Sequence, residues 1–403
     1  MIKPELILPA GNREKASYAL AYGADAVYAG LPGLSLRTKY ISFDELSLGQ
    51  AIDEAHSLGK RFYVACNLFA HEGDLNRVDR FLDVMEEYKP DALIVSDPGI
   101  IRIIRKRKIN IPLHLSTQAN TTNSQALQYW REEGVERVIL ARELRYEELV
   151  RMCQESGGIE LEIFIHGAMC VSYSGRCLLS SFLTGRDANR GACAGTCRWR
   201  YALVEETREV ERFEIEEDAR GSYILNSKDL CLLRRVPELK NLPIHGYKVE
   251  GRTKNLLYVA LIARAYRRVI DDVFIDGSSV IDPEAVRLIG LTDSHGFTEG
   301  FLFPDSEPMQ SYDRGAERSQ QVLGFIRECA DREIRISVKN PLSVGDEAIA
   351  ISPEAMLPIT IVELRMHGKS IDRAYGAMGH EVRALIDKNL AGLLWRYGIL
   401  VKG

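Results

Sequence analysis

The sequence predicts an α/β fold, in which a TIM-like (β/α)8 barrel is followed by a small β-barrel domain. Eight short apolar runs lie between residue 5 and about residue 252, and amphipathic stretches with helical periodicity separate them. This alternation is typical of a parallel sheet covered by helices, and eight is the number of strands that closes a TIM barrel. A chain of 403 residues has room for such a barrel and one smaller domain.

The barrel strands are expected at the apolar runs. In chain order these are Leu6–Leu8, Ala26–Tyr28, Phe62–Ala65, Ala92–Val95, Leu113–Leu115, Val138–Leu140, Leu161–Ile165 and Tyr247–Val249. Helices are expected over residues 13–22, 43–58, 75–88, 124–133, 146–155 and 255–272. No Gly-x-Gly-x-x-Gly turn follows the first strand, where Pro9 to Gly11 stand instead, so a barrel is favoured over an open dinucleotide-binding sheet.

Polar side chains follow several of the expected strands. They are Asn67, Asp97, Ser116, Gln118, Arg142, Glu143, His166, Glu250 and Arg252. The carboxyl ends of barrel strands converge on one mouth, where TIM-barrel chemistry takes place. Each of these residues alone could equally be a helix cap or a loop residue. Their joint placement predicts a functional site at the mouth.

The C-terminal part of the chain has a different pattern. We expect the barrel domain to cover residues 1–290, a turn-rich connection residues 291–317, and a β-barrel domain residues 318–403. The expected strands of this second domain are Val322–Ile326, Glu333–Val338, Glu347–Ile351, Thr360–Glu363 and Leu394–Val401. It has no metal-ligand cluster in its sequence, which favours a binding or positioning role.

Composition and charge are those of an ordinary soluble protein. The net charge is −5 and the apolar fraction is 46%, so overall charge does not indicate nucleic-acid binding. The basic run from Arg102 to Lys108 is expected to be the solvated end of a helix. No apolar run is long enough for a membrane span, and the first residues do not have the pattern of a signal peptide. A cytoplasmic protein without a membrane partner is expected.

Five of the eight cysteines lie within 62 residues, from Cys170 to Cys231. The intervals are six, fifteen, three and thirty-three residues, in loops rich in glycine, arginine and aromatic residues. Thiolates gathered in this way suit a soft metal centre. Disulfides need an oxidising compartment, which the cytoplasmic expectation disfavours. Structural zinc stays an alternative because Cys193 and Cys197 resemble a zinc knuckle.

The pattern disfavours two further explanations of the cysteines. A radical enzyme that uses S-adenosylmethionine would carry a cysteine three residues after Cys197, and that position is Arg200. Buried structural thiols are scattered small hydrophobes, a description that fits Cys66, Cys153 and Cys329 better than the clustered five. We expect the cysteine-rich segment, residues 166–235, to be an insertion after the seventh strand that lies over the mouth. Within it we expect a hairpin over 201–205 and 212–215 and a helix beginning at Asp229, capped by Ser227 or Asp229.

The chain resembles the collagenase-like peptidase family over its whole length. The similar motifs are Leu8–Gly11, Gly23–Gly30, His166–Cys177, Cys193–Trp199, Lys248–Arg252 and the terminal β-domain. The branch that it is most similar to takes part in making 5-hydroxyuridine at the wobble position of tRNA without molecular oxygen. Other relatives in the family hydroxylate ubiquinone precursors.

The resemblance implies a 4Fe-4S cluster and, for the tRNA branch, prephenate as the oxygen donor. The family's ligands correspond to Cys170, Cys177, Cys193 and Cys231, and Cys197 is a rival for one of these sites. The implied partners are the anticodon loop of tRNA, the small-molecule oxygen donor and an electron-transfer partner that the sequence does not identify. A cluster held by four thiolates has no open iron and would transfer electrons, whereas a cluster with one free iron would act by Lewis-acid chemistry.

Other site residues are expected from their chemistry. Prephenate carries two carboxylates, for which Arg142, Arg176, Lys248 and Arg252 would supply cations, and Asn67 is a further substrate-binding candidate at the mouth. Tyr173, Trp199 and Tyr201 are candidates for stacking on an unstacked base. His166 and Glu250 are the candidates for proton transfer because both stand at the ends of expected barrel strands.

Three alternative functions stay open. A peptidase would need an activated nucleophile or a metal-bound water, and the sequence has neither a Gly-x-Ser-x-Gly nor a His-Glu-x-x-His motif. A hydroxylase of another aromatic ring, such as a ubiquinone precursor, would use the same motifs. A non-catalytic RNA-binding protein with a structural zinc or iron-sulfur site is the third alternative.

Overall fold

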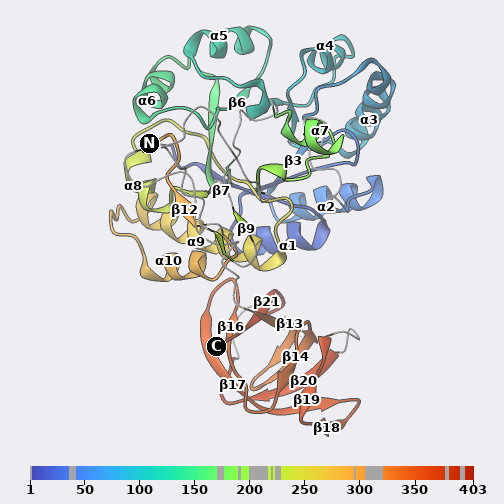
Figure 1. The fold of residues 1–403 in the computed structure, drawn as a ribbon, viewed down its shortest axis with the longest axis vertical. Helices are drawn as coiled ribbons and strands as arrows, with labels where there is room; N and C mark the ends of the chain where they lie inside the picture. The colour runs from blue at the N-terminus through green and yellow to red at the C-terminus, as the bar shows by residue number, and fades with distance from the viewer. Residues whose placement is uncertain are drawn as a thin grey trace.

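Eight parallel strands close into a barrel, and a separate antiparallel β-barrel follows it, which confirms the predicted fold class (Figure 1). The computed structural model describes residues 2–35, 42–169, 177–188, 192–198, 228–294, 296–304, 321–376, 381–390 and 395–403, and the backbone of 217–218 and 221–222. The predicted hairpin over 201–205 and 212–215, and the site candidates Cys170, Tyr173, Arg176, Trp199 and Tyr201, lie outside the described residues.

All eight predicted barrel strands are present. They are β1 (Glu5–Pro9), β2 (Ala26–Gly30), β3 (Arg61–Cys66), β4 (Ala92–Val95), β5 (Leu113–Leu115), β6 (Arg137–Ile139), β7 (Glu160–Ala168) and β11 (Gly246–Val249). Each strand pairs in parallel with the next, and β11 pairs with both β7 and β1 to close the ring. Alternate residues divide between two apolar clusters: Ile7, Tyr28 and Tyr63 belong to the cluster inside the barrel, whereas Leu6 and Val27 pack in the larger cluster under the helices.

The helices surround the strands (Figure 1). They are α1 (Arg13–Ala21), α2 (Glu45–Ser57), α3 (Leu75–Tyr88), α4 (Pro98–Lys106), α5 (Ser124–Glu132), α6 (Tyr146–Gln154), α8 (Val236–Leu239), α9 (Leu256–Phe274) and α10 (Pro283–Gly290). Side-chain caps begin several of them, as when Asp97 accepts a hydrogen bond from the backbone N–H of Ile100 at 3.0 Å. Asp97 is therefore a helix cap, one of the two roles that its position after β4 allowed.

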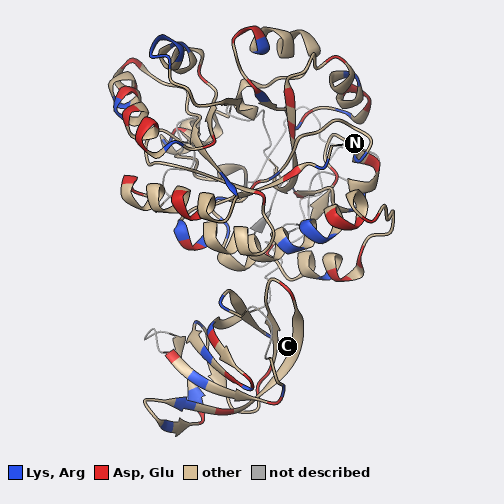
Figure 2. Ribbon diagram, turned by 180° about the vertical axis from the view of Figure 1, so that it is seen from behind, with Lys and Arg blue, Asp and Glu red and all other residues tan. Residues whose placement is uncertain are grey.

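The basic run after α4 is a helix end, as predicted. Arg105 pairs with Glu133 and Arg107 with Glu86, both at 2.9 Å. Lys, Arg, Asp and Glu are interspersed on the outer helices and on the C-terminal barrel (Figure 2). Arg105 and Arg107 thus have acidic partners, whereas the end of α4 itself carries a run of cations, which is blue at the top left of Figure 2.

The predicted helix at Asp229 is wrong. Residues Asp229–Cys231 form strand β10, which pairs antiparallel with the carboxyl end of β7, so that Cys231 lies opposite His166. A short 3-10 turn at Leu233–Arg235 and α8 follow only after this strand. The polar residues here resemble a helix cap, but local helix propensity is weak. Backbone hydrogen bonds with the unpaired end of β7 favour the strand instead.

Part of the predicted connection belongs to the barrel sheet. Phe297–Thr298 form β12, which pairs in parallel with β10. Within the segment between β7 and β10, α7 (Leu179–Thr184) and the backbone hairpin of β8 (Glu217–Asp218) and β9 (Gly221–Ser222) are described. The insertion thus leaves the barrel after β7 and returns to the edge of the same strand.

The C-terminal domain is a closed antiparallel barrel. Its strands are β13 (Val322–Ala330), β14 (Glu333–Val338), β16 (Glu347–Ile351), β17 (Met356–Met366), β20 (Glu381–Ile386) and β21 (Gly398–Lys402), with β18 (Lys369–Ile371) beside β17 and a small pair, β15 (Leu342–Ser343) with β19 (Arg373–Ala374). The five predicted strands correspond to β13, β14, β16, β17 and β21, whereas β20 was not predicted. Pairing of β16 with β17 closes this barrel.

The two domains share a buried interface at α1 and α9. Phe325 and Ile351 of the C-terminal barrel belong to the large apolar cluster of the first domain. The Tyr22 hydroxyl donates to the carbonyl of Tyr397 at 2.9 Å. Arg264, which is 3% exposed, donates to the carbonyls of Ser352 at 2.6 Å and Ala355 at 2.7 Å. The second barrel is therefore fixed against the first.

We expect Arg264→Met to loosen this interface. The substitution keeps the length of the side chain but leaves two buried carbonyls without a charged donor, at a cost of about 3 kcal/mol. Thermal unfolding followed by calorimetry should show an earlier transition for the C-terminal barrel. Arg268→Met is the matched control, because Arg268 pairs with Asp282 near the surface and its loss should cost about 1 kcal/mol or less. Equal transitions in the two variants would contradict the assignment.

None of the helices in the described part is long and apolar enough to cross a membrane.

Candidate active site

An amide and hydroxyl network lies at the mouth of the barrel, after β3, β4 and β5. The Asn67 amide donates to Gln118 Oε1 at 2.9 Å and to Ser116 Oγ at 3.4 Å. The hydroxyls of Ser96 and Ser116 also donate to Gln118 Oε1. All four side chains are buried. The structure thus brings Asn67, Ser116 and Gln118 together as predicted, and adds Ser96.

Cations and aromatic rings alternate across the same end of the barrel. The Arg142 guanidinium lies 5.3 Å from the centre of the Phe164 ring, and Lys248 Nζ lies 6.0 Å from that ring and 4.2 Å from the Tyr28 ring. Arg252 follows, 5.8 Å from Tyr28. This cation-aromatic row, residues 142, 164, 248, 28 and 252, contains three of the predicted substrate-binding residues.

Hydrogen bonds fix the two ends of the cation-aromatic row. Arg142 donates to the carbonyl of Ala168 at 2.7 Å, and Arg252 donates to Ser35 Oγ at 2.6 Å. Guanidinium and ammonium groups over aromatic faces are groups that can bind a planar anionic ligand. Arg142, Lys248 and Arg252, three of the four cations predicted to bind the substrate, therefore lie in one fixed row. Their role in binding stays a prediction.

Lys248 is paired inside the barrel with a residue that the sequence analysis did not single out. Its ammonium donates to Glu162 Oε1 at 2.6 Å, and both side chains are almost fully buried. Burial lowers the pKa of Lys248, and the Glu162 carboxylate opposes that change. The pair is the upper end of a buried ion network that continues to Arg137.

His166 does not lie at the mouth. A bulge between β7 and β11 changes the register at Val249, and the His166 ring lies among Tyr258 and Tyr266 of α9 and Phe297 of β12, at centroid distances of 5.6 to 5.8 Å. Burial, with Lys254 adding to it, lowers the pKa of His166 to about 3, so the imidazole is neutral. The expectation that it closes β7 and faces the mouth is corrected.

Glu250 follows β11 as predicted and is half-buried. Its backbone N–H donates to the His166 carbonyl at 2.8 Å, and its own carbonyl accepts a hydrogen bond from Tyr258 at 2.8 Å. The backbone passes so close to Gly167 that a Cβ there would lie 2.3 Å from the Glu250 carbonyl oxygen. A glycine is thus required at position 167, which also has a φ of 109°.

The described cysteines of the insertion lie in two places. Cys193 is exposed, and Cys177 and Cys197 are half-buried, on the segment that packs on α7 through hydrogen bonds such as Ala194 N–H to Ser180 Oγ at 3.0 Å. Cys231 is half-buried on β10, where the Tyr266 hydroxyl donates to its sulfur at 3.9 Å. Burial raises the pKa of the Cys231 thiol.

The donor chemistry of this region suits an iron-sulfur cluster, since thiolates are its usual ligands and two of these sulfurs already accept hydrogen bonds, Cys193 from the N–H of Gly195 and Cys231 from Tyr266. The positions of the described cysteines, in contrast, do not form one ligand set. Within the described residues, no three His, Cys, Asp or Glu side chains are close enough to hold one metal ion. Cys177, Cys193 and Cys231 therefore do not share one coordination sphere here, and Cys170 lies outside the described residues.

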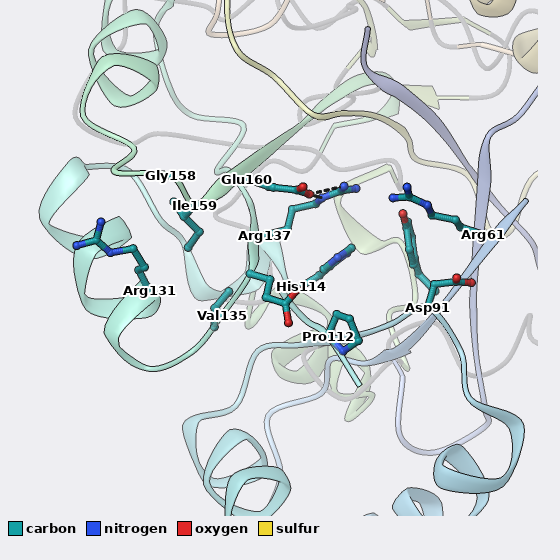
Figure 3. A pocket seen from close by; sticks show the side chains of 12 residues that line it. Arg61, Asp91, Pro112, His114, Arg131, Val135, Arg137, Gly158, Ile159 and Glu160 are labelled. Atoms are coloured by element: carbon teal, nitrogen blue, oxygen red, sulfur yellow. Dashed lines mark hydrogen bonds and ion pairs between the residues drawn. The ribbon is translucent and has the colours of Figure 1, made fainter. Parts of the chain in front are cut away.

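A pocket of about 460 Å³ lies at the opposite end of the barrel (Figure 3). It is lined at the amino ends of the strands by Arg61, His114, Arg137 and Glu160. Burial lowers the pKa of His114, and the nearby cations Arg137 and Lys248 add to the effect, so this imidazole is neutral as well. The pocket exposes the lower end of the ion network whose upper end is Lys248.

Sequence reasoning missed Tyr28, Phe164 and Glu162, although a signal for them was present. All three lie at inward positions of strands, two residues apart in the case of Glu162 and Phe164. A carboxylate in the middle of an apolar strand is unusual, and the alternation of side chains in β7 directs it into the barrel.

Fold and site together define a TIM-like barrel protein with a cation-aromatic row at its mouth, a cysteine-rich insertion after the seventh strand and an appended antiparallel barrel. The chain belongs to Peptidase family U32, whose family model matches residues 11–311.

Named relatives extend this result beyond the barrel. The chain is 37% identical over 428 aligned residues to tRNA hydroxylation protein P of Haemophilus influenzae, a match that covers 94% of this chain and 92% of the relative. It is 40% identical to tRNA hydroxylation protein P1 of Bacillus subtilis, over 87% of this chain and 84% of the relative. A 23S rRNA 5-hydroxycytidine synthase of Escherichia coli is 30% identical, over 85% of this chain and 52% of the relative.

Proposed function

We propose that this protein hydroxylates C5 of a pyrimidine in RNA, the wobble uridine of tRNA, in the cytoplasm and without molecular oxygen. The names of the relatives support an RNA nucleotide as the target, because proteins related over most of the chain are named for tRNA hydroxylation and one for 5-hydroxycytidine in rRNA. The observation that carries the proposal is the cation-aromatic row at the mouth, which offers fixed cations and ring faces to an anion and a base.

The proposed oxygen donor is prephenate. Its two carboxylates would bind Arg142 and Arg252 at the two ends of the row, with Lys248 between them. The amides of Asn67 and Gln118 would bind the polar edge of the base. His166 lies away from the mouth, so the proposal assigns proton transfer to Glu250 alone.

The proposed cofactor is a 4Fe-4S cluster held by Cys170, Cys177, Cys193 and Cys231, which would supply electron transfer together with a partner protein. Within the described residues, Cys177, Cys193 and Cys231 do not form a group that could hold one metal ion. Binding of the cluster therefore requires the described segment of the insertion (residues 177–188 and 192–198) and β10 to come closer together. Anaerobic reconstitution with iron and sulfide should accordingly slow proteolysis of this segment, whereas zinc held by Cys193 and Cys197 alone would leave Cys231 reactive to thiol reagents.

A peptidase function has the family name in its favour, but the buried thiols Cys66 and Cys153 do not support it. Burial raises the pKa of Cys66 to about 12 and that of Cys153 to about 11, so neither is an activated nucleophile. The neutral His166 lies among aromatic rings beside Cys231, the predicted cluster ligand.

The proposal is tested by mass spectrometry of nucleosides from cells that lack the protein. We expect 5-hydroxyuridine and its derivatives to disappear from tRNA and to return when the intact gene is supplied. Loss of 5-hydroxycytidine from rRNA, with tRNA unchanged, would keep RNA hydroxylation but change the target. Unchanged RNA, together with hydrolysis of gelatin by the purified protein, would favour the peptidase.

A further inference from the structure

A column of ionised side chains passes through the inside of the first barrel. At the end of the column that lies near the amino ends of the strands, called its lower end, Arg61 pairs with Glu5 at 2.5 Å, beside the pocket of Figure 3. Arg137 pairs with Glu5 at 2.6 Å and approaches Glu162 at 3.5 Å. At the upper end Glu162 binds Lys248 at 2.6 Å. The column therefore connects the lower pocket with the floor of the mouth.

The charges of this column balance. Arg61, Arg137 and Lys248 are opposed by Glu5, Glu160 and Glu162. The acidic side chains become more buried from the lower to the upper end of the column. The side chain of Glu160 is 42% exposed, whereas that of Glu162 is 0% exposed. A buried ammonium requires a carboxylate close to it, since removal from water disfavours the charged form. In the upper half of the column Glu162 has that position.

We infer that Glu162 is a positioning residue, which keeps Lys248 charged and holds its ammonium over the Tyr28 ring so that it can bind an anionic group of the substrate. The role of the cation in binding rests on the proposed function, whereas its charge state does not. The geometry is a 2.6 Å hydrogen bond on one side of the ammonium and a ring face at 4.2 Å on another. These two contacts fix the direction of the side chain at the floor of the mouth.

The other charged and titratable groups around Lys248 increase the dependence of its charge on Glu162. Arg137 on β6 and Arg252 after β11 both disfavour a further positive charge at Lys248. His114 on β5 lies near enough to be affected by Lys248 and is neutral. Tyr28 on β2 contributes its ring face and donates its hydroxyl to the Val249 carbonyl at 3.0 Å. Without the Glu162 carboxylate, the surroundings of Lys248 are therefore cationic or neutral.

Glu162→Gln tests the inference, because it removes the charge and keeps the shape and a hydrogen-bond acceptor. The charge of Lys248 can be followed by NMR of ¹⁵N-lysine protein, with Lys248→Met used to assign the signal. We expect its titration midpoint to fall by roughly two pH units or more relative to the unsubstituted protein. Glu160→Gln is the matched control, since it removes a carboxylate that binds Arg137 at the exposed end, and it should leave the Lys248 signal unchanged.

Stability gives a second measurement that needs no substrate. A lysine whose pKa is lower in the folded than in the unfolded state binds fewer protons when the protein is folded. It therefore lowers the free energy of unfolding at low pH, and this destabilisation disappears as the pH rises through the pKa of the lysine in the unfolded chain. The Tm of Glu162→Gln should therefore lie roughly 5 to 10 °C below that of the unsubstituted protein at pH 7 and approach it by pH 10. Adding Lys248→Met to Glu162→Gln should remove this pH dependence.

Activity then tests the positioning role. With tRNA and prephenate as substrates, Glu162→Gln should raise the KM for prephenate roughly 10-fold or more at pH 8, with partial recovery at pH 6.5, where Lys248 is charged again. A Lys248 signal that stays charged in Glu162→Gln up to pH 10 would overturn the inference. So would deprotonation of Lys248 with an unchanged KM, an outcome that leaves the proposed function intact. Absence of any tRNA product from the unsubstituted protein would instead reject the proposed function and the role of Lys248 in substrate binding. The NMR titration would still decide whether Glu162 keeps Lys248 charged.

Discussion

Replacing Cys231 by alanine is expected to abolish the modification of RNA while the protein stays folded. Cys231 is the predicted cluster ligand on β10, and loss of one thiolate from a cluster with four leaves an iron without its protein ligand. The cost to folding should be small, about 1 kcal/mol, because the side chain is only half-buried and one sulfur atom is removed. Iron and sulfide content after anaerobic purification and nucleoside analysis of tRNA are the measurements.

Cys329→Ala is the matched control. Cys329 is also half-buried, but it lies on β13 of the C-terminal barrel, far along the chain from the insertion. This variant should keep both iron and activity. Full iron content and normal tRNA in Cys231→Ala would show that Cys231 is a structural thiol, and comparison of Cys193→Ala with Cys197→Ala would show which of the two is the remaining ligand.

The barrel could be predicted from sequence because its strands and helices have strong local periods. Leu6–Leu8 of β1, and β2 and β4, are continuous apolar runs, as expected of strands whose faces are covered by the barrel interior and the helices. Asp229 to Cys231 were misjudged because three residues have no measurable period, and a neighbouring strand determines their conformation. Pairing between distant segments of this kind cannot be read from local composition.

The site was predictable where a residue acts by its position after a strand, and not where it acts through a partner. Asn67 and Gln118 were expected at the mouth because they follow β3 and β5, and they do meet there. His166 was expected beside them, but a bulge in β7 turns its ring toward α9, and bulges have no reliable sequence signal. The Glu162 partner of Lys248 lies 86 residues away in the chain, so only the register of β7 with β11 reveals it.

The second large effect is expected from Arg137→Met, at the centre of the ion network. The guanidinium, 3% exposed, binds Glu5 and Glu160 and approaches Glu162. Its removal leaves one buried negative charge without a counterion, which should cost about 4 kcal/mol and lower the Tm strongly. Arg61→Met provides the control, because Arg61 lies at the exposed end of the network and its loss should cost about 1 kcal/mol or less.

The direction of the pH dependence distinguishes a lost counterion from simple loss of packing. In Arg137→Met the folded protein takes up a proton on the surplus carboxylate more readily than the unfolded chain does, so its deficit in stability should shrink as pH falls from 8 to 5. Glu162→Gln leaves a surplus cation in the same network, and its deficit should shrink as pH rises. Opposite trends in these two variants would show that the inside of the barrel functions as one balanced set of charges. A deficit in Arg137→Met that is constant with pH would mean that the arginine stabilises the barrel by packing alone, and that the charge of Lys248 is set by Glu162 without help from the lower end of the network.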